Sequence, residues 1–191
     1  LNHLSKDLNG ELLLTDLIKV TAEDRGKVET IQTYDREEIV GINNRIDLAR
    51  AERILRFRIL DYWMVNGITI KDPSSTYIDW DAQIGGDSTI LPNCHITGET
   101  TIGTDCIIGP NAVINASQIG NQCSISSCFI EEARLDSCVS VGPYSHLRAG
   151  TQSASNVHIG NYVEIKASKI GEGTKIGHFA YIGDTTVGQK V

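Results

Sequence analysis

Four side chains that could do chemistry lie close together near the C-terminal end of the sequence. They are Arg148, Lys166, His178 and Tyr181. Arginine offers a planar fork of donors and lysine a point charge, so both suit an anion. Imidazole changes protonation near neutral pH and can therefore act as a general base. Taken singly, each has an ordinary interpretation, because an isolated histidine or basic residue in a repeat is usually a solvated surface residue.

A repeat covering residues 84–191 contains all four side chains. Aliphatic residues recur in it every six positions, with occasional steps of five. The series comprises Ile84, Ile90, Ile96, Ile102, Ile108, Ile114, Ile119, Ile125, Ile130, Leu135, Val141, Leu147, Ile159, Ile165, Ile170, Ile176, Ile182 and Val187. A period of six matches neither a helix nor the alternation of a lone strand, and a chance run in a β-sandwich would not keep this phase. It is the hexapeptide signature of a parallel β-helix.

The fold that this period predicts is a three-sided prism. Each hexapeptide would form one face, three faces would form a coil of about eighteen residues, and coils would stack at about 4.8 Å. The aliphatic residue would point inward. The glycine that often follows it, as at Gly103 and Gly160, would ease the corner. The series skips a step at Ser153, where we expect a small loop or an irregular coil.

A long helix is expected before the repeat. Residues 44–66 have an apolar stripe at helical spacing. Asn43 or Asn44 can cap its start, and Gly67 follows its end. We therefore predict a helical arm and linker over 44–78.

The first residues resemble the tail of an α/β domain. A helix is expected to start near Thr15, and residues 27–34 have the composition of a strand. The predicted domains are thus 1–43, the arm, and the β-helix over 79–191.

Charge and composition bear on the class of protein. The formal net charge of −7 gives no basic footprint for nucleic acid. The sequence has no signal peptide and no apolar run of membrane-spanning length, so we expect a cytoplasmic protein without a membrane partner.

The five cysteines do not form a zinc motif, because none is spaced C-x-x-C. Cys106 and Cys123 occupy equivalent places on successive coils and should lie near each other. They could form a redox pair, but free thiols in a cytosolic protein are the simpler interpretation.

Five short strings carry more specific information than the repeat. In order they are Gly41-Ile42-Asn43-Asn44-Arg45, Asp72-Pro73, Gly142-Pro143-Tyr144-Ser145-His146-Leu147-Arg148-Ala149-Gly150, Gly160-Asn161-Tyr162-Val163-Glu164-Ile165-Lys166 and Gly177-His178-Phe179-Ala180-Tyr181-Ile182-Gly183-Asp184. Their order and spacing resemble the bacterial GlmU family over essentially the whole chain. Members of that family join an N-acetylglucosamine-1-phosphate uridyltransferase to a glucosamine-1-phosphate N-acetyltransferase.

The resemblance implies a fold and two reactions. The fold would be a left-handed parallel β-helix that forms a homotrimer, preceded by a long linker helix and the C-terminal remnant of an α/β nucleotidyltransferase domain. Acetyl transfer from acetyl-CoA to glucosamine 1-phosphate would occur between neighbouring subunits. Uridylyl transfer from UTP to N-acetylglucosamine 1-phosphate, with Mg²⁺, would follow in the other domain. The product, UDP-N-acetylglucosamine, feeds peptidoglycan and, where present, lipopolysaccharide synthesis.

The resemblance also implies residue roles. His178 would be the general base of acetyl transfer, and Arg148, Lys166 and Tyr181 would contact the sugar phosphate. Asn43 would help hold Mg²⁺ and the nucleotide sugar, while its structural alternative is a helix cap. The chemistry agrees with these roles, because the attacking amine must lose a proton before it can use its lone pair.

The sequence departs from the family pattern in three places. Ala149 replaces a proline, His146 replaces an arginine, and Leu12-Leu13 replaces two tyrosines. The chain also begins with Leu1 and ends within a repeat unit, so we expect a fragment. Such a fragment would lack the nucleotide loop and the later coils that hold acetyl-CoA. Alone it would not complete uridylyl transfer, and it would bind acetyl-CoA poorly.

Three other interpretations remain open. A sugar-1-phosphate nucleotidyltransferase with a structural or regulatory β-helix would leave His178 and Lys166 without a role. A γ-type carbonic anhydrase uses the same scaffold with three histidines that bind zinc between subunits, but the helical arm and the positions of His146, His158 and His178 do not favour it. A purely structural, ice-binding type of solenoid needs regular threonine rows, and the threonines here have no period.

Overall fold

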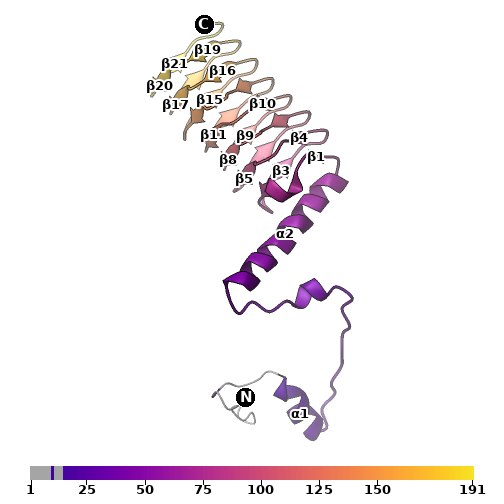
Figure 1. Cartoon of the computed structure of the whole chain (residues 1–191). Coiled ribbons are helices and arrows are strands. Elements are labelled where there is room, and N and C mark those ends of the chain that lie inside the picture. Colours follow the sequence, from indigo (N-terminus) through magenta and orange to yellow (C-terminus); the bar gives the residue numbers. More distant parts are fainter. Residues whose placement is uncertain (1–9, 11–14) are drawn as a thin grey trace. The chain divides into compact units, whose positions relative to one another are not determined.

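The computed structural model describes residue 10 and residues 15–191 (Figure 1). The chain forms two compact units, Leu1–Gly41 and Ile42–Val191, and each is described by itself. The second unit contains the expected helical arm and the whole repeat.

In the described part of the first unit, the elements are α1 (Asp16–Glu23) and the 3₁₀ helix η1 (Arg36–Ile39). The predicted helix start near Thr15 is confirmed. The predicted strand at 27–34 is wrong, because a strand needs a neighbour to pair its N–H and C=O groups and the described residues supply none. These residues therefore show no remnant of an α/β domain. Leu12-Leu13 lies outside the described residues.

The expected arm is the helix α2 (Arg45–Val65). The side-chain oxygen of Asn44 accepts from the N–H groups of Ile46 at 2.9 Å and Asp47 at 3.0 Å. Asn44, and not Asn43, is therefore the N-cap. The helix ends before Gly67, whose φ of +92° an L-residue would adopt only with strain.

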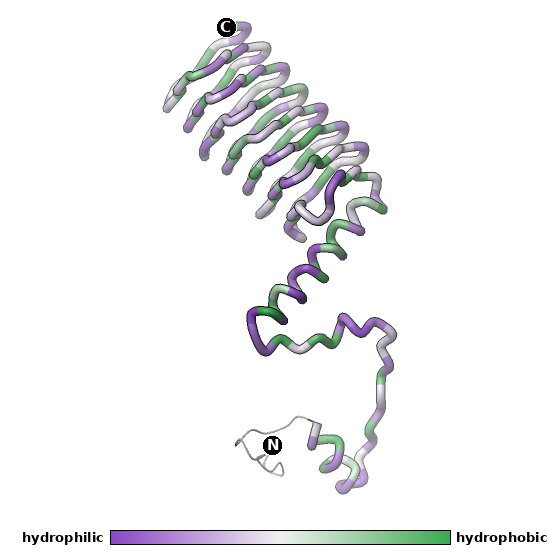
Figure 2. The backbone as a smooth tube through the Cα atoms, viewed as in Figure 1, coloured by the Kyte–Doolittle hydropathy of each residue, from purple (hydrophilic) through white to green (hydrophobic). Residues whose placement is uncertain are grey.

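Only the C-terminal third of α2 is buried. Ile59, Leu60 and Trp63 pack on the first coil, whereas Leu48 and Leu55 are exposed although they belong to the same stripe. The helix extends past the end of the prism, so its first turns have no coil to cover them (Figures 1 and 2). No helix in the described part of the chain has both the length and the apolarity to cross a membrane.

The repeat forms three parallel sheets of seven strands each. The first sheet comprises β1 (Thr69–Ile70), β4 (Thr89–Ile90), β7 (Ile107–Ile108), β10 (Ser124–Ile125), β13 (Ser140–Val141), β16 (His158–Asn161) and β19 (Lys175–His178). The second comprises β2 (Tyr77–Ile78), β5 (His95–Thr97), β8 (Val113–Asn115), β11 (Phe129–Glu131), β14 (His146–Leu147), β17 (Glu164–Lys166) and β20 (Tyr181–Gly183). The third comprises β3 (Gln83–Ile84), β6 (Thr101–Ile102), β9 (Gln118–Ile119), β12 (Arg134–Leu135), β15 (Gln152–Ser153), β18 (Lys169–Ile170) and β21 (Thr186–Val187). The short 3₁₀ helix η2 (Pro73–Ser75) joins β1 to β2.

Each strand pairs with the third strand further along the chain, which confirms the parallel β-helix. The aliphatic residues stack in register inside the prism, as Ile130 does between Ile114 and Leu147. All three are fully buried. Burial of each such side chain contributes roughly 1.5–3 kcal/mol to stability. Because the buried side chains stack from coil to coil, the core is a continuous column and not a local cluster.

The expected loop at Ser153 is wrong. Ser153 lies in β15, in register between Leu135 and Ile170, and is buried like the aliphatic residues above and below it. Its hydroxyl donates to the carbonyl of Ala154 at 3.1 Å. The backbone pairing of the neighbouring coils maintains the register, and a small residue with a satisfied hydroxyl fits the inward position.

The glycines after the aliphatic residues have two different roles. Gly109 and Gly142 have the positive φ of a turn, as expected, whereas others are required for close packing. Gly120 lacks a positive φ, and a Cβ there would lie 2.7 Å from the backbone of Asp136 in the next coil. Close approach of the neighbouring coil therefore excludes a side chain. Many other left-handed corner positions carry side chains, such as Asp105 (φ +56°) and Gln122 (φ +57°).

Cys106 and Cys123 lie on adjacent coils as predicted. The backbone N–H of Cys123 donates to Sγ of Cys106 at 3.4 Å, and both residues are buried. All five cysteines are free thiols. A hydrogen bond between the two thiols lowers the pKa of Cys106 to about 7 and raises that of Cys123.

Candidate functional site

The outer face of the second sheet carries three of the predicted site residues. Arg148 follows β14, Lys166 ends β17 and Tyr181 begins β20. Because side chains alternate along a strand, the residues on both sides of an inward aliphatic residue point outward. Lys166 pairs with Gly183 of the next coil, and Arg148 lies one coil earlier at the same position. The sheet thus places the three residues on one surface.

Two carboxylates accompany the two cations on this face. Nη1 of Arg148 lies 2.8 Å from Oε1 of Glu164, and Nζ of Lys166 lies 3.6 Å from Oδ2 of Asp184. The hydrogen bond to Glu164 raises the pKa of the Arg148 guanidinium above its usual value, and Tyr181 adds to this effect. The Arg148 and Lys166 side chains are 44% and 43% exposed, so both cations can reach an anion from solvent.

Sequence reasoning did not single out these carboxylates. Glu164 lies two positions before Lys166, so alternation alone places it on the same face. Its ion pair with Arg148 joins adjacent coils, which the hexapeptide register could have indicated.

His178 lies at the corner beside this face. It ends β19 of the first sheet, is exposed, and precedes Tyr181 by one short turn. Its ring contacts Phe179 edge to face, with centroids 5.7 Å apart. The structure therefore brings Arg148, Lys166 and Tyr181 together on a face and places His178 on the adjoining edge of the prism.

An aromatic column runs along the same corner. Tyr144, Tyr162 and Phe179 stack on successive coils, with ring centroids 5.4 and 5.0 Å apart. All three are exposed and have positive φ. Sequence reasoning missed this column, although the three residues occupy equivalent places in consecutive coils. It provides an apolar wall next to His178.

Asn43 lies apart from the other predicted site residues. It precedes α2, and its backbone N–H donates to Oδ2 of Asp47 at 3.3 Å. The last turns of α2 pack on the first coil, whereas Lys166 and Tyr181 belong to the last coils (Figure 1). The structure therefore does not bring Asn43 to the face of the second sheet.

The other histidines of the repeat have partners within the fold. The rings of Tyr77 and His95 stack with their centroids 4.6 Å apart. Oε2 of Glu131 lies 3.1 Å from Nε2 of His146, and Oγ of Ser140 lies 2.7 Å from Nδ1 of His158. Residues 15–191 contain no group of three or more histidine, cysteine or carboxylate side chains that could hold a metal ion.

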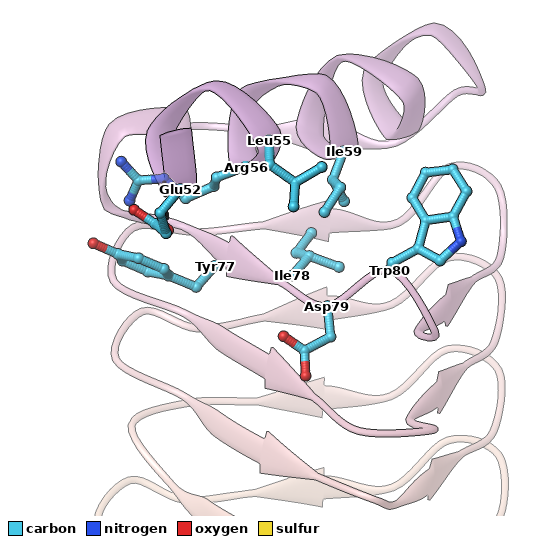
Figure 3. A pocket seen from close by; sticks show the side chains of 8 residues that line it. All are labelled: Glu52, Leu55, Arg56, Ile59, Tyr77, Ile78, Asp79 and Trp80. Carbon is cyan, nitrogen blue, oxygen red and sulfur yellow. Dashed lines mark ion pairs between the residues drawn. The ribbon is translucent and has the colours of Figure 1, made fainter. Parts of the chain in front are cut away.

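A pocket of about 250 Å³ lies between α2 and the first coil (Figure 3). Leu55 and Ile59 of the helix face Ile78 of β2. Arg56 lies over the Tyr77 ring, 4.3 Å from its centroid. The pocket is lined by none of the predicted site residues, so the candidate site is the outer face of the second sheet and its corner.

Comparison with known proteins first defines a class. The family model of the bacterial transferase hexapeptide (six repeats) matches residues 81–116. A solved structure from Bacillus cereus, provisionally described as an acetyltransferase, matches with a TM-score of 0.54 at 16% identity. The match covers 62% of this chain and 75% of that chain, and at this identity it shows the fold alone. The chain is therefore a hexapeptide-repeat β-helix, preceded by a helix.

Curated relatives then identify the chain more narrowly. The bifunctional protein GlmU of Streptococcus agalactiae serotype V is 44% identical over 188 residues, which are 96% of this chain and 41% of the relative. That of Carboxydothermus hydrogenoformans is 45% identical over 182 residues, 95% of this chain and 41% of the relative. The chain is a homologue of the GlmU proteins and spans about two fifths of the length of these relatives.

Proposed function

We propose that this chain carries the sugar-phosphate part of an acetyltransferase site, which transfers an acetyl group from acetyl-CoA to the amine of glucosamine 1-phosphate. The main support is the cluster of Arg148, Lys166 and Tyr181 on one exposed face, one corner away from His178, in a homologue of GlmU.

The phosphate binds to Arg148 and Lys166 in this proposal. Arginine can present two parallel N–H groups to phosphate oxygens, and lysine adds a second positive charge. Glu164 and Asp184 hold the two cations in place, 2.8 and 3.6 Å away. These pairs are half-exposed, so each contributes little to stability and can admit a third, anionic group.

His178 removes the proton in the acetyl transfer step. The neutral amine of the sugar bonds to the thioester carbonyl carbon through its lone pair, and His178 takes one of the two protons of that nitrogen as the bond forms. The carbon–sulfur bond then breaks, and the proton held by the imidazole passes to the departing thiolate. Such a general base contributes a factor of about 10²–10⁴ to the rate. The Phe179 ring, at the end of the aromatic column, contacts the imidazole edge to face.

The partners follow from the same proposal. A bacterial cytoplasmic homotrimer with left-handed coils would place the face of one subunit against the next, and the acetyl-CoA site would lie between them. His178 lies on an edge of the prism, where a neighbouring subunit could complete its surroundings.

Uridylyl transfer is not part of what we propose for this chain. An amide oxygen such as that of Asn43 suits Mg²⁺ as one ligand. However, the described residues supply no group of three or more acidic or histidine side chains that could hold the ion. We therefore derive no step with Mg²⁺ or UTP, and Asn43 keeps only the role that the family resemblance predicts.

The test is release of CoA thiol from acetyl-CoA in the presence of glucosamine 1-phosphate. It uses the longest polypeptide encoded in frame with this sequence. His178→Ala should lower kcat by about 10²–10⁴-fold. The matched control is His158→Ala. His158 is paired with Ser140 and lies at the opposite end of the first sheet's strands from His178, so its turnover should stay within about twofold of the wild type.

Two results would contradict the proposal. Absence of thiol release in the wild type would favour a nucleotidyltransferase whose β-helix is structural. Equal losses in the two histidine variants would show that His178 has no special part in proton transfer.

A further inference from the structure

Gly183 interrupts a column of polar side chains on the second sheet. The column consists of the outward residues that follow the inward aliphatic ones, and successive coils pair it in register. Its members are Asp79, Thr97, Asn115, Glu131, Arg148, Lys166 and Gly183. The first six carry polar side chains, whereas the last carries none. A glycine at this position therefore needs a reason.

The backbone does not supply that reason. Gly183 has no positive φ, so its conformation is open to any L-residue. At other glycines of the repeat, such as Gly120, the backbone of the next coil leaves no room for a side chain. At Gly183 the three atoms that a Cβ would meet first all belong to one side chain, that of Tyr181.

The Tyr181 ring occupies the space above Gly183. A Cβ at residue 183 would lie 2.6 Å from Oη of Tyr181 and 2.9 Å from its Cε1 and Cζ atoms. Both distances are far below a van der Waals contact. The ring therefore lies along β20, over the glycine, and does not stand away from the sheet.

This orientation carries the phenol toward the two cations. Gly183 is the register partner of Lys166, so the Tyr181 hydroxyl above Gly183 lies on the coil next to Lys166 in this column. Arg148 lies one coil before Lys166 in the same column, so its guanidinium belongs to the same face. The hydroxyl, Lys166 and Arg148 thus face one patch of solvent.

We propose that Gly183 is a positioning residue, whose missing side chain lets the Tyr181 ring lie along the strand and sets its hydroxyl as a third donor to the phosphate. This inference rests on the proposed function. It adds a requirement that the sequence motif does not state: the tyrosine and the glycine two positions later act as one unit.

A double-mutant cycle tests this unit through the KM for glucosamine 1-phosphate. Gly183→Ala should raise KM about tenfold or more and change kcat by less than about threefold, as for loss of one hydrogen bond to a charged group. In a Tyr181→Ala background the space is empty, and Gly183→Ala should add less than about twofold. Equal effects in both backgrounds, or no effect in either, would overturn the proposal.

Gly86→Ala is the matched control, because a Cβ at Gly86 meets nothing within 4 Å and its φ is also not positive. Its KM should equal that of the wild type. A rise as large as that of Gly183→Ala would mean that any added methyl disturbs the site, and would overturn the specific role of Gly183.

A spectroscopic measurement separates this inference from the proposed function. The ring signal of Tyr181 in ¹³C-tyrosine protein can be identified with Tyr181→Phe among the six tyrosines. It should shift in Gly183→Ala without any ligand, and an unchanged signal would overturn the geometry. If the ring moves but the wild type releases no thiol, the positioning stands and the phosphate role fails together with the proposed function.

Discussion

The two ends of the second sheet carry similar side chains in different surroundings. At the first coil, Arg56 of α2 lies over the Tyr77 ring at 4.3 Å and donates to the Ser74 carbonyl at 3.2 Å. At the last coils, Arg148 pairs with Glu164 near Tyr181. The Arg56 side chain is 11% exposed, and that of Arg148 is 44% exposed.

Burial separates the two arginines in function. The Arg56 guanidinium is occupied within the fold by the Tyr77 ring, the Ser74 carbonyl and Glu52, whose Oε1 lies 4.0 Å from its Nε. Arg148 keeps its charge in contact with solvent, where an anionic substrate can reach it. The same residue types therefore fasten the helix at one end of the sheet and form the candidate site at the other.

The strongest test of this comparison concerns the inward column that underlies both ends. Ile165→Ala should lower the free energy of unfolding by about 2–5 kcal/mol, because it opens a cavity in a fully buried stack. Ile96→Ala, at the same position near the first coil, should lose a similar amount. Chemical denaturation measures both, and a much smaller loss at Ile96 would contradict a uniform core.

Arg148→Ala should act on binding and not on stability. We expect KM for glucosamine 1-phosphate to rise about 10–100-fold, as for loss of a charge-assisted hydrogen bond. The free energy of unfolding should change by less than about 1 kcal/mol, because the pair with Glu164 is exposed. The control is Arg134→Ala on the third sheet, whose KM should not change. An unfolding midpoint that falls only in Arg148→Ala would assign Arg148 to structure.

Arg56→Ala should show the opposite pattern. Loss of the contact with Tyr77 and of the bond to Ser74 should destabilise the protein by about 1–2 kcal/mol. Removal of the buried Nε, which has no hydrogen-bond partner among the described residues, should offset part of this loss. Arg53→Ala, exposed on the same helix, should change stability by less than about 0.5 kcal/mol. Neither should alter KM. Thermal unfolding and the thiol assay together decide whether the two arginines differ as described.

The smallest expected effect concerns the start of the helix that holds Arg56. Asn44→Ala removes the oxygen that caps Ile46 and Asp47 and should reduce stability by about 1 kcal/mol. Asn43→Ala should reduce it by a few tenths at most, since only the backbone of Asn43 bonds to Asp47 in the structure. Helix content measured during thermal unfolding distinguishes them. Equal losses of stability in the two variants would show that the Asn43 side chain also caps the helix.

Much of the architecture was predictable because the β-helix has a local code. The period of six alone gives the inward column and the parallel pairing. The code fails where composition misleads. Ser153 was predicted to open a loop, yet the strands on either side hold it in register. Residues 27–34 have strand composition, but composition without a pairing neighbour does not make a strand.

The candidate site was predictable in its members and not in its geometry. Alternation places Arg148 and Lys166 outward, and the six-residue step places them on the same face, so the sequence by itself determined which surface they share. Only the tertiary structure decided the pairing of Arg148 with Glu164 and the position of the Tyr181 ring over Gly183. The reason is physical. Periodicity sets which way a side chain points, but distances within a few ångströms depend on how neighbouring coils pack and on which rotamer the free space allows.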